Sequence, residues 1–577
     1  MFASYLARRA FLARSLGATA LSATIPSASR AASSLQETSA GWEPLDTFIA
    51  RYLRAMNAPG ITLALANRDG TVRTAAFGYD DLETKTPVTT DLMFETGSIT
   101  KSFVALTLLQ LRDQGKLEVN RPILEYLPWL PIEANYGVIT VHHLLTHTSG
   151  LPDALGLFLT DPHGRHVQGF KPGEHFHYCN VGFAILGYLI QSIERRPWPD
   201  SIRARIFEPL GMNSSSAVIT NRTRDRRPKS YVPFSNDLVY LRQGRLAQAA
   251  NLTFEDAAGS VESTPGDMAL YIRMLLRGGQ GPNGRIVSEE SFGLFTKPNI
   301  KAPDLSPTAS YGYGIGVDQL DGHRILRHTG GMTSFASAMH IDLDGGVAAW
   351  ASVNAMQGYR PNPVTQFAVQ VMNAQAQHKP VPAPPQLTDP AVVKNASEYA
   401  GVYTSSDGRK IEIAANGDRV TMQAGSQSFP LELAGGDAFL ATVGEWQEYP
   451  ILFDRAHGAA GGNGDKEPPV VELMYGPDWY TNDRYSGPRS YPNPADLDKF
   501  SGRYATDDPW VGGVRIVVRK GQLWLEGATP LERLGGALFR MSAEPHNPDT
   551  AEFFYEVDGK MQLLKLNGAD LWRLSAA

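Results

Sequence analysis

Apolar and polar residues alternate with two different periods over residues 41–377. The apolar run at 61–66 precedes the turn Arg68-Asp69-Gly70 and predicts a strand. Residues 98–115 show helical spacing of apolar positions and stop at a glycine, which predicts a helix. Thr264-Pro265-Gly266-Asp267 has the form of a capping box, and Gly345-Gly346 that of a hairpin turn before a buried strand. This part of the chain is therefore predicted to be mixed α/β.

A proline tract at residues 380–385 ends this mixed pattern. Such a tract is typical of a semi-rigid, extended linker, which we place at residues 378–392. Beyond it the helical period disappears, and short alternating segments such as 410–413 and 515–518 remain between glycine-containing turns. That pattern predicts antiparallel β sandwiches or barrels.

The β-rich region contains an internal repeat. Tyr399-Ala400-Gly401-Val402-Tyr403 is echoed 101 residues later by Phe500-Ser501-Gly502-Arg503-Tyr504. Each copy leads into a strand, a glycine turn and another strand, and residues 471–475 also resemble 552–555. We therefore expect two similar β domains, at 393–487 and 497–577, rather than one large sheet.

Composition narrows the class of protein. A chain of 577 residues predicts several domains, and a net charge of −6 without a long basic run argues against nucleic acid as a partner. The single cysteine, Cys179, excludes an intramolecular disulfide and a cysteine-based zinc cluster. The uncharged stretch at 178–193 is too short for a membrane span and suits a buried helix, so no stable membrane insertion is expected.

The first 31 residues have the features of an export signal. Arg8-Arg9 and Phe11-Leu12 precede a mildly apolar stretch that ends in small residues, as in twin-arginine signals. Cleavage after residue 31 would remove four arginines and no acidic residue, and change the net charge from −6 to −10. We expect a periplasmic or secreted protein; the alternative is a disordered extension on a cytoplasmic one.

The predicted helix at 98–115 begins with Ser98-Ile99-Thr100-Lys101. Residues three apart share a helix face, so the Lys101 amine can reach the Ser98 hydroxyl and take its proton. The helix N-terminus favours the negative charge that develops on the oxygen. Alone, this tetrapeptide is weak evidence, because Ser98 could simply cap the helix.

Three further segments give the tetrapeptide a context. They are Tyr178-Cys179-Asn180, His328-Thr329-Gly330-Gly331, and the run Leu-Leu-Thr-His-Thr-Ser-Gly-Leu-Pro at 144–152. In chain order, with Ser98-Ile99-Thr100-Lys101 first and 144–152 between it and Tyr178-Cys179-Asn180, they resemble the motifs of the penicillin-recognising serine hydrolases, in particular the class C β-lactamase-like esterases and peptidases. The resemblance covers residues 41–377 and implies an α/β (α+β) β-lactamase/transpeptidase-like catalytic domain.

The resemblance also implies roles for individual residues. Ser98 would be the acylated nucleophile, Lys101 its proton acceptor, and Tyr178 the group that protonates the leaving group and activates water. Asn180 would bind substrate and hold Lys101. His328 and Gly330 would line the substrate site, and the backbone N–H groups of Ser98 and Gly331 would form the oxyanion hole. No metal or organic cofactor is implied. The alternative to these roles is a structural one, in which Tyr178 is an ordinary core residue and Asn180 only caps a helix.

Two positions depart from the family pattern. Cys179 stands where many relatives have serine, and we expect it to be structural. His328 stands where β-lactamases have a lysine, and a histidine is mostly neutral at pH 7, so a carboxylate anchor there is weaker. The His-x-Gly form resembles D-aminopeptidases and some family esterases, which argues against β-lactamase activity.

The remaining histidines are not expected to bind a metal ion. His143 and His147 have helical spacing but lack the glutamate of a metalloprotease motif, so His147 is expected to be packed. The irregular cluster that precedes Tyr178 is expected to line the cleft; it comprises His163, His166, His175 and His177.

A catalytic domain followed by two β-barrel domains resembles the three-domain D-aminopeptidases, whose last domain sends a loop toward the active site. The polar segment 542–550 is a candidate for that loop, and deleting 544–549 would then alter peptide selectivity. Our primary hypothesis is a serine peptidase or amidase that cleaves short linear peptides, including those with D- or unusual residues. A carboxylesterase on the same site and a non-catalytic peptide- or cell-wall-binding protein are the alternatives. The sequence does not fix the oligomeric state, and a homodimer is possible as well as a monomer.

Overall fold

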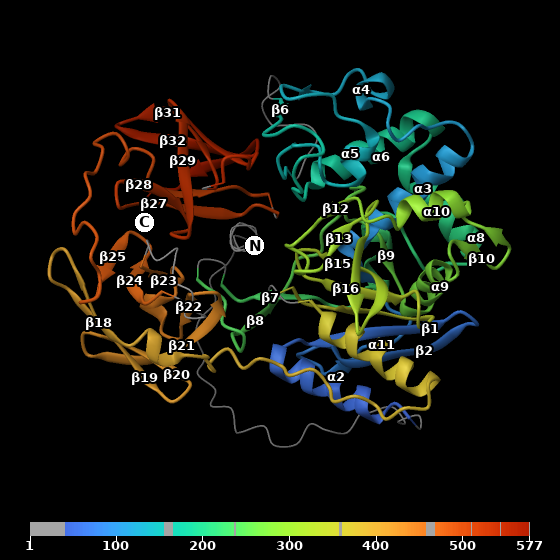
Figure 1. Cartoon of the computed structure of the whole chain (residues 1–577), viewed down its shortest axis with the longest axis horizontal. Helices are drawn as coiled ribbons and strands as arrows, with labels where there is room; N and C mark the ends of the chain where they lie inside the picture. Colours follow the sequence, from blue (N-terminus) through green and yellow to red (C-terminus); the bar gives the residue numbers. More distant parts are fainter. Residues whose placement is uncertain are drawn as a thin grey trace.

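The computed structural model describes residues 41–575 apart from 155–164, 236–237, 357–359, 457–467, 509 and 543. The predicted export signal at 1–31 lies outside the described residues. Figure 1 shows a mixed α/β part and, beside it, two β barrels formed by the C-terminal part of the chain. The expected order of architectures is confirmed: a mixed α/β part is followed by two antiparallel barrels. No described helix is long and apolar enough to cross a bilayer.

The α/β part is built on one nine-stranded antiparallel sheet with the order β12-β13-β14-β15-β16-β17-β1-β2-β3. The strand bounds are β1 Gly60–Asn67, β2 Thr71–Asp81, β3 Thr86–Pro87, β12 Ile300–Lys301, β13 Ser310–Tyr311, β14 Gly316–Leu320, β15 His323–Gly331, β16 Ala336–Asp342 and β17 Val347–Val353. The two predicted strands at 61–66 and 347–353 are β1 and β17. They pair with each other in the middle of the sheet.

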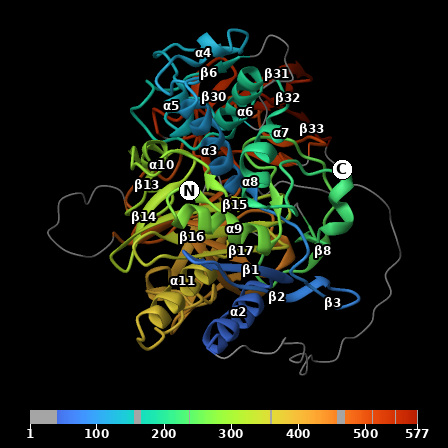
Figure 2. The same cartoon turned by 90° about the vertical axis from the view of Figure 1, so that its right-hand side faces the viewer.

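Helices cover both faces of this sheet. The bounds of the α-helices are α2 Glu43–Met56, α3 Thr100–Asp113, α4 Ile123–Tyr126, α5 Val141–Leu145, α6 Asn180–Glu194, α7 Trp198–Ile202, α8 Glu208–Leu210, α9 Pro265–Leu276, α10 Glu289–Phe295 and α11 Asn362–Ala376. Figure 2 shows α2 and α11 below the sheet and the other helices above it. Alternate residues of β1 enter two different cores: Leu63 packs with α2 and α11, whereas Ala64 packs on the α9 side. Burial on both faces explains why β1 is apolar almost throughout.

The predicted helix at 98–115 begins with a short 3-10 turn, Gly97–Ile99, and continues as α3. Most side chains of α3 are buried, because it lies inside the helical region. At α9, Thr264 caps the helix by accepting from the Asp267 backbone N–H, but the capping box is incomplete. The Asp267 carboxylate instead accepts from Ser214 and Ser215.

Residues 401–481 and 502–573 form two closed barrels of eight strands each. The first comprises β18 Gly401–Ser405, β19 Lys410–Asn416, β20 Arg419–Ala424, β21 Gln427–Gly435, β22 Ala438–Ala441, β23 Ile451–Arg455, β24 Val470–Tyr475 and β25 Asp478–Thr481. The second comprises β26 Gly502–Ala505, β27 Gly513–Arg519, β28 Gln522–Leu525, β29 Thr529–Gly535, β30 Leu538–Arg540, β31 Thr550–Val557, β32 Lys560–Leu566 and β33 Ala569–Arg573. Each barrel has its own apolar core, so a single large sheet is excluded for the described residues.

The repeat has a structural basis at the start of each barrel. The Tyr403 hydroxyl donates to the Tyr399 carbonyl, and the Tyr504 hydroxyl donates to the Phe500 carbonyl, both at 2.8 Å. One further correspondence was wrong: residues 471–475 lie in β24, the seventh strand of its barrel, whereas 552–555 lie in β31, the sixth of its own. Alternation of apolar residues alone does not distinguish neighbouring strands of a barrel.

Candidate active site

Ser98 lies in the 3-10 turn between β4, Phe94–Glu95, and helix α3. Its side chain is half-buried, whereas Lys101, one turn further on, is fully buried. Lys101 Nζ lies 3.1 Å from Ser98 Oγ, 2.8 Å from Asn180 Oδ1 and 2.8 Å from the Ala258 carbonyl oxygen. These three oxygens hold the amine within proton-transfer distance of the Ser98 hydroxyl.

Tyr178 lies against the same amine. Lys101 Nζ is 4.9 Å from the centre of the Tyr178 ring, and the ring of His147 packs on Tyr178 with 4.2 Å between centroids. Cys179 is buried, and its thiol donates to the Pro152 carbonyl at 3.2 Å. Burial raises the pKa of this thiol well above its ordinary value, so it stays protonated.

His147, whose ring packs on Tyr178, has a left-handed backbone conformation. It is 1 % exposed and has a φ of 58°, in the left-handed region that bulky residues rarely adopt. Its Nδ1 accepts from the Cys179 backbone N–H at 3.1 Å. Burial, followed by the charge of Lys101, lowers the pKa of His147 well below its ordinary value. A neutral His147 therefore supports the backbone that carries Tyr178.

Asn180 is the first residue of α6 rather than its cap. Its backbone N–H and its Nδ2 both donate to Asp153 Oδ1 at 2.9 Å. Because Nδ2 is held by Asp153, the other end of the amide, Oδ1, faces Lys101. Sequence reasoning missed Asp153, although it follows directly on the Leu151-Pro152 end of the recognised segment.

The His328-Thr329-Gly330-Gly331 segment ends strand β15, which runs beside the 3-10 turn of Ser98. A Cβ on Gly330 would lie 1.7 Å from the Thr96 carbonyl oxygen, and one on Gly97 would lie 2.5 Å from the Gly331 nitrogen. Only glycine at 330 permits this approach of the two backbones. The structure thus brings together residues from each of the three motifs that the sequence separates.

His328 does not carry the positive charge of this site. Its Nδ1 lies 2.6 Å from the Thr329 carbonyl oxygen, and its Nε2 lies 2.9 Å from the Tyr311 hydroxyl. In the neutral tautomer Nδ1 donates and Nε2 accepts. Burial, and next the charge of Lys101, lowers the pKa of His328 to about 3. The imidazole is therefore neutral at all pH values well above 3.

Arg360 is the positively charged side chain that contacts the Gly330-Gly331 end of β15. The sequence analysis did not identify it. Its guanidinium donates to the Gly330 carbonyl, and a Cβ on Gly331 would lie 2.1 Å from Arg360 Nη1. Arg360 and His328 both line a small cavity of about 140 Å³ next to β15. An arginine stays charged at any working pH. No local sequence pattern marks Arg360, because it reaches the site from the segment before α11.

The histidines that precede Tyr178 do not form one cluster. His163 lies outside the described residues. His166 is buried in β6, His166–Val167, whereas His175 and His177 face the second barrel. His175 stacks on His546, and His177 Nε2 lies 3.5 Å from Asp549 Oδ1. The expectation that all four line the cleft is therefore wrong for His166.

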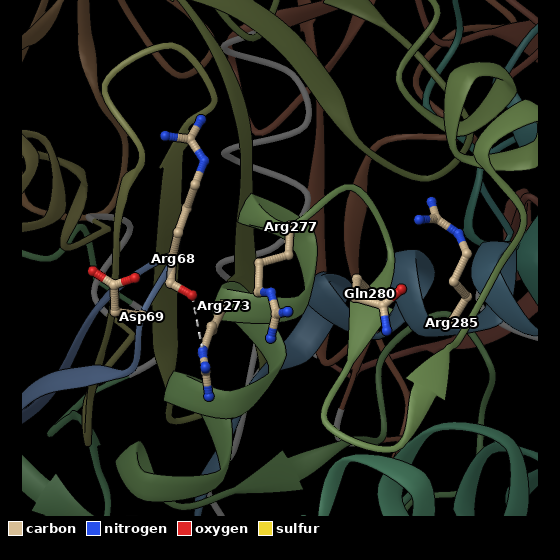
Figure 3. Close-up of a pocket in the computed structure, with 6 residues that line it drawn as sticks. All are labelled: Arg68, Asp69, Arg273, Arg277, Gln280 and Arg285. Carbon is tan, nitrogen blue, oxygen red and sulfur yellow. Dashed lines mark hydrogen bonds between the residues drawn. The ribbon is translucent and has the colours of Figure 1, made fainter.

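A second, open depression of about 570 Å³ is lined by Arg68, Asp69, Arg273, Arg277, Gln280 and Arg285. Figure 3 shows that the guanidinium groups of Arg68 and Arg285 point one way, and those of Arg273 and Arg277 the other. Arg68, Arg273 and Arg285 each donate to a backbone carbonyl. These arginines do not converge on one point, so the depression lacks the features of a built anion site.

Comparison with known proteins gives four informative matches. A family model described as Beta-lactamase matches residues 45–371. Penicillin-binding protein 4* of Bacillus subtilis (strain 168) is 24% identical over 383 residues, which cover 61% of this chain and 81% of that protein. Penicillin-binding protein 4 of Amycolatopsis lactamdurans is 28% identical over 282 residues, 45% of this chain and 71% of the relative. The octameric penicillin-binding protein homologue from Pyrococcus abyssi shares the fold, with a TM-score of 0.51 and 23% identity over 76% of this chain and 98% of its own.

Proposed function

This chain belongs to the beta-lactamase family, whose model spans more than half of its length, and on that premise we propose that it is a serine peptidase or amidase. It hydrolyses short linear peptides, including those with D- or unusual residues, through an acyl-enzyme at Ser98. The observation that carries the proposal is the buried Lys101 amine, 3.1 Å from Ser98 Oγ and held by two carbonyl oxygens. That arrangement activates a nucleophile, and a purely binding protein has no need of it.

In the proposed reaction, Ser98 Oγ attacks the substrate carbonyl carbon while Lys101 takes the hydroxyl proton. The oxyanion is stabilised by the backbone N–H groups of Ser98 and Gly331, a contribution of about 3 kcal/mol per donor. Tyr178 passes a proton to the departing amine nitrogen, the C–N bond breaks, and the acyl group stays on Ser98. A water molecule then attacks the ester carbonyl carbon and gives one proton to the Tyr178–Lys101 pair. The bond between the acyl carbon and Ser98 Oγ breaks, the pair returns a proton to Oγ, and the acid leaves.

A carboxylesterase on the same site is the alternative function. An alkoxide or phenolate leaves without prior protonation, whereas an amine must be protonated as it leaves. The proximity of the Tyr178 ring to Lys101 favours the amide reaction, because it places a phenol next to the group that holds the proton.

A substrate series decides between these functions. We expect the full-length protein to release amino acids from a library of di- and tripeptides with D- or L-residues at either end, and intact-mass analysis of a slow substrate to show an adduct on Ser98. Hydrolysis of p-nitrophenyl esters without any peptide or amide turnover would identify an esterase. Binding of peptides without turnover of either class would contradict the enzyme proposal.

Arg360 is expected to bind a substrate carboxylate. Since His328 is neutral, the guanidinium that donates to the Gly330 carbonyl places a positive charge at this end of β15, where an anionic end of a peptide would meet it. Arg360→Gln should therefore raise KM about tenfold for peptides with a free C-terminal carboxylate, because a charged hydrogen bond contributes about 1.5–3 kcal/mol.

The matched control for this prediction is the same peptide as its C-terminal amide, whose KM should change less than about twofold. Arg324→Gln, an exposed position on the same strand, should change neither KM. An equal rise in KM for the acid and the amide would contradict carboxylate binding by Arg360.

A further inference from the structure

The second barrel contacts the catalytic part close to Tyr178 and Asn180. The contacting residues lie in the segment 544–549 between β30 and β31 and in the turn between β32 and β33. The ring of His546 stacks on that of His175, with 4.1 Å between centroids and 15° between planes. A Cβ on Gly169 would lie 2.6 Å from Pro548 Cα, so the two backbones touch. The barrel is thus packed against the loop that leads into α6.

Within this contact, the backbone of Asp153 is held at both of its polar groups. The Asp153 N–H donates to Asp549 Oδ1 at 2.9 Å, and Asn567 Nδ2 donates to the Asp153 carbonyl at 3.3 Å. Asn567 Nδ2 also donates to Asp549 Oδ1 at 3.0 Å, which joins the two side chains. Residues 151–154 carry no helix or strand. Their backbone polar groups therefore need partners from elsewhere in the structure.

From Asp153 the hydrogen bonds continue into the candidate active site. Asp153 Oδ1 accepts twice from Asn180, and Asn180 Oδ1 accepts from Lys101 Nζ. A continuous series of hydrogen bonds thus joins the Asp549 carboxylate to the Ser98 hydroxyl. The residues between them are Asp153, Asn180 and Lys101. Each link is a hydrogen bond of 2.8–3.1 Å.

The charge on Asp549 is balanced within the same interface. Burial by itself lowers the pKa of His177, but the Asp549 carboxylate, 3.5 Å from Nε2, raises it above its ordinary value. Burial by itself raises the pKa of Asp549, and His177 and the hydrogen bonds to it bring the net pKa below the ordinary value. The carboxylate therefore remains ionised as an acceptor for the Asp153 N–H.

We propose that Asp549 and Asn567 of the second barrel are positioning residues for acylation, which hold Asp153 so that Asn180 keeps the Lys101 amine within proton-transfer distance of Ser98 Oγ. The proposal rests on the proposed function, because it concerns the acylation step. It assigns the second barrel a role in the chemical step itself, apart from any contact with a substrate. Misplacement of a catalytic group by about 1 Å can cost about a hundredfold in rate.

The test is the rate at which a small fluorophosphonate labels Ser98 in the full-length protein. This probe carries no peptide, so barrel contacts with substrate cannot affect it. Asp549→Ala and Asn567→Gly should each slow labelling about tenfold or more. Glycine is chosen at 567 because that residue has a φ of 47°, which glycine adopts without strain. The labelling rates of wild type and variants are compared at one temperature, chosen so that circular dichroism shows every variant to be folded.

Two variants serve as matched controls. Asp549→Asn keeps an oxygen that accepts from the Asp153 N–H and from Asn567 Nδ2, so labelling should stay within about twofold of wild type. Glu544→Gln, exposed on the same segment, should leave the rate unchanged.

Wild-type labelling rates in folded Asp549→Ala and Asn567→Gly would overturn the proposal, and so would an Asp549→Asn rate as slow as that of Asp549→Ala. An effect on peptide KM alone, with labelling unchanged, would also overturn it and leave the barrel a substrate-binding role. Failure of the wild-type protein to be labelled at Ser98 would instead contradict the proposed function, whatever the variants do.

Discussion

Replacing Ser98 with alanine is expected to abolish fluorophosphonate labelling and to lower kcat by at least about ten-thousandfold, in line with loss of the nucleophile in other serine hydrolases. The physical reason is that no oxygen remains to form the acyl bond. Direct attack of water then relies only on the oxyanion hole and on substrate binding. The effect should appear in kcat, with KM for the substrate nearly unchanged, because a methyl group in place of a hydroxyl leaves the peptide contacts intact.

The measurement is labelling by the probe, followed by peptide mapping, together with turnover of the best substrate from the library. Ser501→Ala in the second barrel is the matched control, since its hydroxyl donates only to a local carbonyl in the described structure. Labelling of Ser98→Ala at the wild-type rate would show that another residue is the nucleophile and would refute the role of Ser98.

Replacing Lys101 with methionine is the second large effect that we expect, with acylation slowed at least about a thousandfold. Methionine has a similar length and is apolar, so the buried space is filled while the proton acceptor is lost. The change also removes the donor to Asn180 Oδ1 and the Ala258 carbonyl, at a cost of about 1–3 kcal/mol per unsatisfied group. The melting temperature should therefore fall as well.

Pre-steady-state labelling separates this chemical effect from the loss of stability, because it is measured on protein that is still folded. Lys116→Met, an exposed lysine just after α3, is the control and should retain the wild-type rate. Lys101→Met that is fully folded and acylated at the wild-type rate would exclude Lys101 as the proton acceptor.

Short-range patterns in the sequence were enough for much of this architecture. Helical spacing identified α3, and the 3-10 turn that leads into it places Ser98 within reach of Lys101. The repeat of Tyr399–Tyr403 as Phe500–Tyr504 indicated two β domains, and the same hydroxyl-to-carbonyl bond forms in each barrel. The strand correspondence further along was wrong, since β-strands of one barrel share the same alternation and only the hydrogen-bonded order distinguishes them.

The sequence by itself determined the family, the two-barrel organisation and the candidate Ser98, Lys101 and Tyr178, because these depend on residue types at fixed spacings along the chain. The tertiary structure decided the environment of those groups: Asp153 orients Asn180, His328 is neutral, Arg360 carries the charge beside Gly330, and Asp549 reaches in from the second barrel. These partners come from segments far apart in the chain. Packing of the sheet, the helices and the barrel brings them together, and burial at their contacts then sets which side chains are charged.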